Sequence, residues 1–376
     1  MKIVCLMILA AVIGAVHSDR NSVNLLQNRQ SLIAPMQLPL ASSVTSPVYR
    51  AQAGQWQFNL HSYIAWYKGK FWAIWSSGKV NEDNGQQRID YATSSDGHHW
   101  SAAGVLVDSL PIPALWIARG IFTQNGHLYA FAASSDGSRK NGMRSEAWHN
   151  LRLVRFEWYG SSWHKLGTYL DNCMNNFPPR PFGGHLFMTC RDSYGVMHTA
   201  VSSSLDGLHW TVTKLPGKPP VDDMSEPSWY IDPQGTGHLI FRDAGGSKYL
   251  YQSISHDQGR TWSTPTRTNY PDATSKNFSG RLSNGWYYLI NNPNQKARDP
   301  LAISFSRDGW SFSHPIALRK GAPPLRYSGK HKGGHGSFQY PQAMEHRGSL
   351  WAIYSTNKED IEISEYKLSD FNLPKS

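Results

Sequence analysis

One short pattern occurs four times in this chain and limits its fold more than any other feature. It reads SSDGHHW at 94–100, SLDGLHW at 204–210, SHDQGRTW at 255–262 and SRDGWSF at 306–312. Each copy follows an apolar-alternating run. Its Asp and Gly suit a tight turn in which the carboxylate accepts backbone N–H groups and Gly takes a positive φ. The pattern therefore predicts boxes that stabilise turns and take no part in catalysis.

A second pattern precedes the boxes and shows that the repeated unit is larger. An apolar strand, a turn with glycine and an aromatic strand recur six times: SYIAWYKGKFWAIWSS, GIFTQNGHLYAFAAS, RPFGGHLFMTCRD, PSWYIDPQGTGHLIFRD, SGRLSNGWYYLINN and PQAMEHRGSLWAIYST. Adding the strand before each box and the strand after it gives about four strands per unit. Asp206, Asp257 and Asp308 are 51 residues apart, and the 110 residues between Asp96 and Asp206 leave room for a repeat whose box has decayed.

This period indicates the fold class, an all-β chain folded as a single β-propeller of four-stranded blades. A β-sandwich or a jelly roll would give no reason for a fixed spacing. Six repeats are counted directly. Residues 19–55 are expected to supply a closing strand to the last blade or most of a seventh blade.

The amino-terminal residues MKIVCLMILAAVIGAVHS have the three zones of a secretory signal peptide: one lysine, an apolar run, and small residues near Ser18. We therefore expect a signal peptide at 1–18, a propeller domain at 19–376, and a secreted or periplasmic location. No later apolar stretch is long enough for a membrane helix, so no membrane span is expected. Cys173 and Cys190 remain in the mature chain, and both a disulfide and two buried free thiols fit the sequence.

The net charge of +10 predicts an anionic partner. Exported proteins meet acidic polysaccharides more often than nucleic acids, and the chain has no lysine-rich run or nucleic-acid motif. We therefore expect an acidic poly- or oligosaccharide as the partner, no nucleic acid, and a monomeric protein. Uronic and sialic acids are the sugars that this reasoning favours.

Propeller geometry predicts which polar residues come together. The first strand of each blade lines the channel and the second runs back antiparallel, so the start of the first and the end of the second meet at the face opposite the boxes. The starts of first strands contribute His61, Arg119, Arg180, Glu226, Asn277, Arg281, Gln339 and Tyr340. The ends of second strands contribute Glu82, Asp83, Arg191, Asp192, Arg242, Asp243, Arg298, Asp299, Lys358, Glu359 and Asp360.

The residue types at this face favour a site for an acidic sugar. His61 is the first catalytic candidate because imidazole exchanges protons near neutrality, and Tyr340 and Glu226 are further candidates as proton donor or nucleophile. A guanidinium holds a carboxylate by two parallel hydrogen bonds, so the predicted substrate-binding residues are Arg119, Arg180, Arg191, Arg242, Arg281, Arg298 and Gln339. The competing interpretation is structural, because an Arg-Asp pair at a strand end can be an ion pair within one blade and a single histidine can serve packing alone.

No Ser-His-Asp order, zinc-ligand spacing or phosphate-binding loop stands out in the sequence. HKGGHG at 331–336 places His331 and His335 on a glycine loop without a third paired ligand, which favours a loop at the rim over a metal site. We therefore expect no required cofactor, and the ligands of any metal are unknown.

The boxes resemble the Asp-box (BNR) repeats of sialidases and their relatives, over residues 61–366. This resemblance implies a propeller and leaves the activity open, because Asp boxes occur in proteins of many functions. Sialidases of the usual kind also carry an Arg-Ile-Pro segment in the first blade. This chain has LHSYIAWYKGKFWAIWSSG in the corresponding place.

The chain is more similar to the sialidase-like propellers that release terminal L-rhamnose from glucuronic acid in arabinogalactan and gum arabic. The similarity rests on LHSYIAWYKGKFWAIWSSGKVNEDNGQQRIDYATSSDG, RDPLAISFSRDG and FQYPQAMEHRGSLWAIYSTNKEDIE. It implies seven blades, a catalytic histidine in the first blade that corresponds to His61, and a structural calcium ion in the propeller channel.

The resemblance and the residues lead to one main hypothesis and two alternatives. In the main one the protein is a lyase: an arginine-held carboxylate acidifies the C5 proton of the glucuronate, His61 removes this proton, and the 4-O-linked rhamnose leaves. In the second the protein is a hydrolase of sialidase type, and hydrolysis would use two carboxylates, Glu226 with Asp83 or Asp243. In the third the propeller binds glycans without catalysis.

Overall fold

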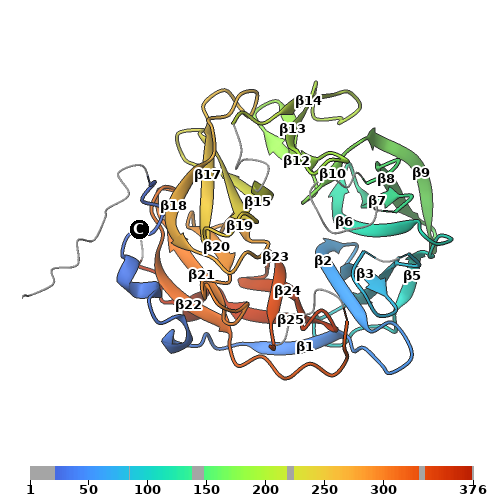
Figure 1. Ribbon diagram of the computed structural model, residues 1–376, viewed down its shortest axis with the longest axis horizontal. Coiled ribbons are helices and arrows are strands. Elements are labelled where there is room, and N and C mark those ends of the chain that lie inside the picture. Colours follow the sequence, from blue (N-terminus) through green and yellow to red (C-terminus); the bar gives the residue numbers. More distant parts are fainter. Residues whose placement is uncertain (1–21, 84, 138–147, 218–223, 330–334, 375–376) are drawn as a thin grey trace, which may run out of the picture.

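The structure is a computed structural model that describes residues 22–83, 85–137, 148–217, 224–329 and 335–374, so the predicted signal peptide at 1–18 lies outside the described residues. Within these ranges the strands form six antiparallel sheets arranged as blades around a ring (Figure 1). This confirms the single all-β propeller and the count of six repeats. The helices of these ranges are short 3-10 turns, and none has the length and apolar character of a membrane span.

In the first three blades the strands follow chain order from the centre outward. Blade 1 consists of β2 (Phe58–Tyr67), β3 (Lys70–Gly78), β4 (Arg88–Ser94) and β5 (Gly104–Val107). Blade 2 consists of β6 (Leu115–Gln124), β7 (His127–Ser135), β8 (Arg152–Tyr159) and β9 (Ser162–Asp171). The innermost position of blade 3 is divided between two short strands, and this blade consists of β10 (Met174–Asn175), β11 (Arg180–Phe182), β12 (His185–Arg191), β13 (Met197–Ser202) and β14 (Trp210–Lys214).

The last three blades repeat this order until the ring closes. Blade 4 consists of β15 (Met224–Ile231), β16 (Gly237–Asp243), β17 (Tyr249–Ser255) and β18 (Thr266–Pro271). Blade 5 consists of β19 (Phe278–Arg281), β20 (Tyr287–Asn291), β21 (Leu301–Ser306) and β22 (Ser313–Arg319). Blade 6 consists of β23 (Phe338–His346), β24 (Ser349–Thr356), β25 (Asp360–Lys367) and, as its outer strand, β1 (Val44–Tyr49). The short helix η4 (Leu368–Phe371) follows β25.

The amino-terminal segment closes the ring and does not form a further blade. Figure 1 shows the blue strand β1 beside the red strand β25, and the two pair antiparallel. Before β1, residues 22–43 run along the edge of blades 4 and 5 with the short helices η1 (Arg29–Leu32) and η2 (Pro35–Gln37). Leu25, Leu26 and Leu32 are buried there against these two blades. The seven blades implied by the resemblance are therefore wrong for this chain, because its amino-terminal residues pack onto existing blades.

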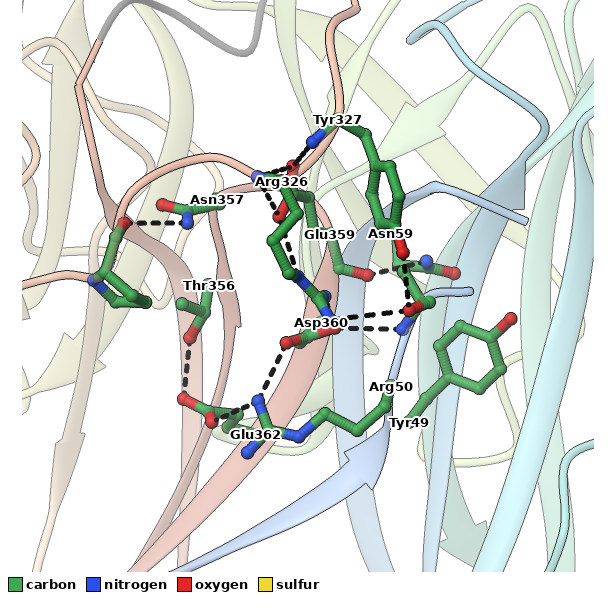
Figure 2. Close-up of polar contacts among 12 residues, drawn as sticks. Tyr49, Arg50, Asn59, Arg326, Tyr327, Thr356, Asn357, Glu359, Asp360 and Glu362 are labelled. Carbon is green, nitrogen blue, oxygen red and sulfur yellow. Dashed lines mark hydrogen bonds and ion pairs between the residues drawn. The ribbon is translucent and has the colours of Figure 1, made fainter. Parts of the chain in front are cut away.

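Polar contacts reinforce the closure between β1, β25 and the loop at 320–329. Asp360, 5% exposed, accepts hydrogen bonds from the Ala51 backbone N–H at 2.9 Å and from Arg50 Nη1 at 2.7 Å. It also pairs with Arg326, and Glu359 accepts the backbone N–H groups of Arg326 and Tyr327 (Figure 2). The turn that contains Glu359 and Asp360 thus holds the end of β1 and the loop at 320–329 together.

The four boxes form the turns that the sequence predicts. Asp96 accepts the backbone N–H groups of His98 at 2.8 Å and His99 at 2.9 Å, and Gly97 has a φ of 81°. Asp206, Asp257 and Asp308 accept backbone N–H groups in the same way. The indole N–H of Trp100 donates to the Gly97 carbonyl at 2.9 Å, so the closing aromatic residue secures the turn.

Each box glycine also faces the blade that precedes its own. A Cβ on Gly97 would lie 2.3 Å from the Trp351 ring of blade 6, and one on Gly259 would lie 2.8 Å from Phe187 of blade 3. The boxes therefore allow one blade to pack closely on the next.

Replacing Gly97 with Ala should lower the free energy of unfolding more than replacing Gly69 with Ala. Both glycines have similar positive φ values, 81° and 77°, so the backbone strain of the two alanines is matched. Only Gly97 faces a ring, since no atom lies within 4 Å of a Cβ on Gly69. Overpacking should add about 1 to 2 kcal/mol to the loss. Denaturant unfolding measures both variants, and equal losses would show that the boxes do not join the blades.

Candidate functional site

Four of the innermost strands carry a β-bulge in their first half. The cross-strand register shifts between Leu60 and Tyr63 in β2, Ala118 and Gly120 in β6, Ser225 and Ser228 in β15, and Gln339 and Gln342 in β23. His61, Arg119, Glu226 and Tyr340 lie inside these shifts. The φ angles of His61, Glu226 and Tyr340 are 56°, 49° and 59°. A bulge re-aims a side chain, and left-handed backbone at bulky residues gathers at functional sites.

These four side chains line one cleft of about 650 Å³ at the end of the ring opposite the boxes. Leu60, beside His61, pairs with Ser76 near one end of β3, whereas the box residue Ser94 pairs with Phe71 at the other end. Of the predicted catalytic and binding residues, the cleft brings together His61, Arg119, Arg191, Glu226, Arg242, Arg298, Gln339 and Tyr340, and it adds Glu82, Asp83 and Lys358. The convergence expected from propeller geometry is therefore observed, while the roles of these residues stay predictions.

Arg180 does not line this cleft, contrary to the sequence prediction. The innermost position of blade 3 is divided, and β10, not β11, lies beside Arg191. Arg180, at the start of β11, lies 4.3 Å above the Trp229 ring and donates to the Trp229 carbonyl. It therefore joins blades 3 and 4 and is not placed to bind substrate.

Arg281 is also placed elsewhere. The strand β19 begins at Phe278 and ends at Arg281, which pairs with Tyr287 across the hairpin. The arginine is thus exposed at the hairpin end, with its guanidinium 5.4 Å from the Tyr287 ring. Arg281 is therefore at a strand end, whereas the sequence predicts a strand start there.

Arg242 joins two of the predicted catalytic residues. Its Nη1 donates to Glu226 Oε2 at 2.5 Å and to the Tyr340 hydroxyl at 2.8 Å. Burial alone would raise the pKa of Glu226, but Arg242, Lys276 and Arg191 outweigh it and lower the pKa to about 2. Burial raises the pKa of Tyr340, although Arg242 opposes this rise. The cluster therefore holds an ionised carboxylate and a neutral phenol on one guanidinium.

His61 is a neutral imidazole inside this cationic cleft. It is 4% exposed, and its ring centroid lies 5.3 Å from that of Tyr340 in an edge-to-face arrangement. Burial lowers its pKa well below the usual range, and Arg119 and Lys276 lower it further. Its Nδ1 has no hydrogen-bond partner among the described residues. A neutral His61 can accept or donate one proton toward a ligand.

The first blade contributes a pair of neighbouring carboxyl groups with different environments. Glu82 forms an ion pair with Lys358. Burial raises the pKa of the Asp83 carboxyl to about 6, and the Glu82 carboxylate adds to this rise. Asp243, the other carboxylate considered as a partner of Glu226, instead accepts the backbone N–H groups of Gly245 and Ser247, both at 2.6 Å. Asp83 is therefore the carboxyl group in the cleft that can hold a proton near pH 6.

Sequence reasoning missed the buried Lys276 and its partner Tyr63. Lys276 Nζ donates to the Tyr63 hydroxyl at 2.9 Å and to the Asn176 carbonyl at 3.0 Å. Burial lowers the pKa of this lysine well below its usual range, and Glu226 opposes the change. Lys276 precedes the strand β19 and matches no motif. Its buried position is therefore apparent only in the folded structure.

A disulfide supports the blade 3 side of the cleft. Cys173 and Cys190 are bonded, with Cα atoms 5.4 Å apart, which decides between the two alternatives left by the sequence. Met174 follows the first cysteine, Arg191 follows the second, and these two residues pair between β10 and β12. The disulfide therefore links the start of β10 to β12, the two strands that carry Met174 and Arg191.

The described part of the cleft offers few free ligands for a calcium ion. Calcium takes six to eight oxygen ligands, largely carboxylates and carbonyls. Among the described residues no group of three His, Cys, Asp or Glu side chains is placed to hold a metal ion. Two of the three carboxyl groups that line the cleft contact a cation instead, in the pairs of Glu226 with Arg242 and Glu82 with Lys358. The structural calcium ion implied by the resemblance therefore stays a prediction.

A six-bladed ring with Asp-box turns and a polar, largely cationic cleft defines a sialidase-like β-propeller. The model of the BNR repeat-like domain family matches residues 59–353, and this chain belongs to that family. No curated protein matches the sequence.

Several solved structures share the fold at low sequence identity. A sialidase is 20% identical with a TM-score of 0.61, and the match covers 87% of this chain but 33% of that protein. Trypanosoma rangeli sialidase in complex with sialic acid is 15% identical with a TM-score of 0.62, and the match covers 90% of this chain and 59% of that one. A protein of unknown function from Dyadobacter fermentans DSM 18053 is 14% identical with a TM-score of 0.66, over 88% of this chain and 100% of that one.

These likenesses show the fold alone. This chain spans a third to three fifths of the two sialidases, so their activity does not transfer with the fold. None of the three carries the name of a lyase that releases rhamnose, so the resemblance to such lyases gains no support from them.

Proposed function

We propose that this protein is a glycoside hydrolase that removes a terminal acidic sugar, with Tyr340 as the nucleophile. The observation that carries the proposal is the bonding of both Glu226 and Tyr340 to Arg242 Nη1 at 2.5 Å and 2.8 Å. Tyrosine serves as a nucleophile in sialidases, which are exceptions to the rule of two catalytic carboxylates. The low-identity likeness to sialidases agrees with a carbohydrate-active role.

Glu226 is the base that the tyrosine needs. Burial keeps the Tyr340 phenol protonated, so its oxygen gains nucleophilic strength as the proton moves to a neighbouring carboxylate. The tyrosine oxygen then attacks the anomeric carbon, and the bond to the departing glycan breaks. Arg242 remains against both groups and stabilises the negative charge that passes between them.

Asp83 supplies the proton for the leaving oxygen. Its pKa of about 6 keeps a large share of the carboxyl protonated in weakly acidic solution. After the glycan has left, the Asp83 carboxylate accepts a proton from a water molecule whose oxygen attacks the anomeric carbon. The bond from the sugar to Tyr340 breaks, and Glu226 returns its proton to the tyrosine oxygen. The role matches a general acid of raised pKa that later acts as a base.

The rate should fall as the pH rises above about 6. A general acid works in its protonated form, so kcat should decrease about tenfold per pH unit well above the pKa of Asp83. Replacing Asp83 with Asn should lower kcat and remove this alkaline decline. Rates measured with a substrate whose leaving group needs no protonation provide the control, because they should depend little on Asp83. A wild-type rate that is constant between pH 6 and 8 would contradict the assignment.

The charge of the cleft favours an acidic sugar. Arg119, Arg191, Arg242 and Arg298 line it, together with Lys358, and Glu226 and Glu82 neutralise part of this charge. A carboxylate on the sugar would meet these cations in a partly enclosed space where charge pairs are stronger than in water. Export of the chain, expected from residues 1–18, would bring it to extracellular glycans of this kind.

A uronate lyase is the second candidate, and His61 favours it. This residue is neutral, faces the cleft and has an unpartnered Nδ1, as a base that removes a proton beside a carboxylate requires. Its reaction would leave a double bond in the uronate, whereas hydrolysis would not.

A panel of acidic glycosides distinguishes these functions. Fluorogenic sialosides and glucuronides and a rhamnosyl-glucuronate from gum arabic are incubated with the protein, and free sugars and ultraviolet absorbance are recorded. Release of an acidic sugar without new absorbance is the expected result. Free rhamnose with rising ultraviolet absorbance would overturn the proposed hydrolase and support the lyase. Binding of these glycans without any product would leave a binding protein and overturn both.

A further inference from the structure

A second hollow lies at the end of the ring that carries the boxes. It is a groove of about 520 Å³ between blades 1 and 2, and we call it the aromatic groove. Two of its lining residues, Tyr67 and Lys70, pair at the hairpin of β2 and β3, next to the box that begins at Ser94. His61 lies toward the other end of β2, and the groove shares no lining residue with the cleft. Its volume is within the roughly 300–1,000 Å³ that is usual for ligand sites.

Four aromatic side chains form most of the wall of this groove. Tyr67, Trp72 and Tyr91 belong to blade 1, and Trp158 belongs to blade 2. The Trp158 ring centroid lies 4.8 Å from that of Trp72 and 5.7 Å from that of Tyr91. The Tyr67 hydroxyl donates to the Gly126 carbonyl of blade 2 at 3.2 Å. Contacts within the protein therefore hold these rings in place before a ligand binds, which lowers the entropic cost of binding.

Blade 2 contributes Trp158 through a hairpin that has no box. Only Gly160 and Ser161 join β8 to β9, and Trp158 pairs with Trp163 across this hairpin. In blades 1, 3 and 4 the closing tryptophan of the box donates its indole N–H to the carbonyl of the box glycine. The repeat whose box is missing from the sequence therefore has a tryptophan pair at this place. Both rings contact Trp72 of blade 1, and Trp158 lines the groove.

Two lysines give the groove a positive charge. Lys68 and Lys70 line it and are exposed, and none of the described residues that line it is acidic. Lys68 Nζ lies 5.2 Å from the centroid of the Tyr67 ring. Thr93 and Ser101 add hydroxyl groups to the lining. Aromatic faces beside cations and hydroxyls match a sugar that has apolar C–H faces, hydroxyl groups and a carboxylate.

We propose that the aromatic groove is a second, noncatalytic site that binds a polysaccharide chain bearing uronic acids. The C–H faces of its sugars pack on Trp158 and Tyr91, and its carboxylates approach Lys68 and Lys70. A protein partner fits this groove less well, because lysine is depleted where proteins bury their contacts. The groove holds the polymer at a distance from the cleft, and its role does not depend on the reaction that the cleft performs.

The test measures binding to a polymer and does not need turnover. Polygalacturonate and the neutral polymer dextran are titrated calorimetrically into the wild-type protein, into Trp158→Ala and into the double variant Lys68→Gln, Lys70→Gln. The wild type should bind polygalacturonate more tightly than dextran. Trp158→Ala should lose about tenfold or more in polygalacturonate affinity, because the sugar loses its aromatic platform. The lysine variant should lose about three- to tenfold at low salt and less at high salt, where exposed charges are screened.

Two matched controls separate the groove from other parts of the surface. Tyr159→Ala removes an aromatic side chain that follows Trp158 in the chain, is 72% exposed and does not line the groove. The double variant Lys248→Gln, Lys296→Gln removes two exposed lysines that line the cleft, so it matches the charge lost from the groove. Both controls should keep the polygalacturonate affinity within about twofold of the wild type.

Three results would overturn the inference. The first is a wild type that does not bind polygalacturonate or binds dextran equally well, and the second is a loss in the cleft lysine variant as large as that in the groove lysine variant. The third is self-association in sedimentation that Trp158→Ala removes, because a second copy of the chain would then occupy the groove. Thermal unfolding of each variant separates lost binding from lost structure. The groove lysines are exposed, so their variant carries the test if Trp158→Ala does not fold.

Activity distinguishes this inference from the proposed function. On a small acidic glycoside, which does not reach from the cleft to the groove, the two groove variants should keep the kcat and KM of the wild type. A protein that hydrolyses no acidic glycoside but binds polygalacturonate through the groove would overturn the proposed function and leave the second site standing.

Discussion

Tyr340→Phe is expected to lower kcat on an acidic glycoside by about 10³-fold or more. The change removes the attacking oxygen and little else. Arg242 keeps its ion pair with Glu226, and the phenyl ring keeps its edge-to-face contact with His61. The affinity for an acidic sugar should change little, since the cations that line the cleft all remain. The measurement is a kcat and KM series on the substrate that the glycoside panel identifies.

Tyr270→Phe is the matched control for this prediction. Tyr270 is also buried, and its hydroxyl bonds Ser304 Oγ at 2.5 Å, away from the cleft. This variant should lose stability and keep its activity. If Tyr340→Phe retained activity within tenfold while His61→Ala abolished it, the assignment of Tyr340 as the nucleophile would be wrong. The elimination mechanism would then replace hydrolysis.

The sequence predicts this fold well because its signals are local. A box turn is specified by an aspartate, a glycine and a closing aromatic within eight residues, and strand alternation appears within each hairpin. Asp96 and Gly97 make the contacts that those residue types imply. The presence of a seventh blade cannot be predicted in this way, because it depends on where residues 22–43 pack. Burial of Leu25 and Leu26 on blades 4 and 5 is a tertiary choice that no local pattern contains.

The candidate site is predicted only in part, because its side chains come together through contacts between residues that lie far apart in the sequence. Strand starts identify His61 and Tyr340, because every blade places its first residues at one face. Arg180 and Arg281 were assigned wrongly, since an error of a few residues in the register moves a side chain to another wall. Pairings between blades are also invisible in the sequence: Lys358 of blade 6 and Glu82 of blade 1 are 276 residues apart.

Asp360→Ala is expected to lower the free energy of unfolding by about 3 kcal/mol. The carboxylate is buried and joins β25 to the Ala51 N–H, to Arg50 and to Arg326, as Figure 2 shows. The Arg50 and Arg326 side chains are 52% and 43% exposed, so water compensates much of their loss. The larger part of the effect should come from the Ala51 N–H, which loses its acceptor in a buried position. Denaturant unfolding of the intact chain measures the loss.

Asp171→Ala is the control, because Asp171 is 83% exposed and lies 3.9 Å from Arg152 in a loose ion pair. That variant should unfold within about 0.5 kcal/mol of the wild type. If Asp360→Ala unfolded no more easily than Asp171→Ala, the backbone ladder between β1 and β25 would suffice to close the ring. The expected difference implies more than stability: Asp360 belongs to the turn that carries Lys358 into the cleft, so the contacts that close the ring also hold one wall of the site in place.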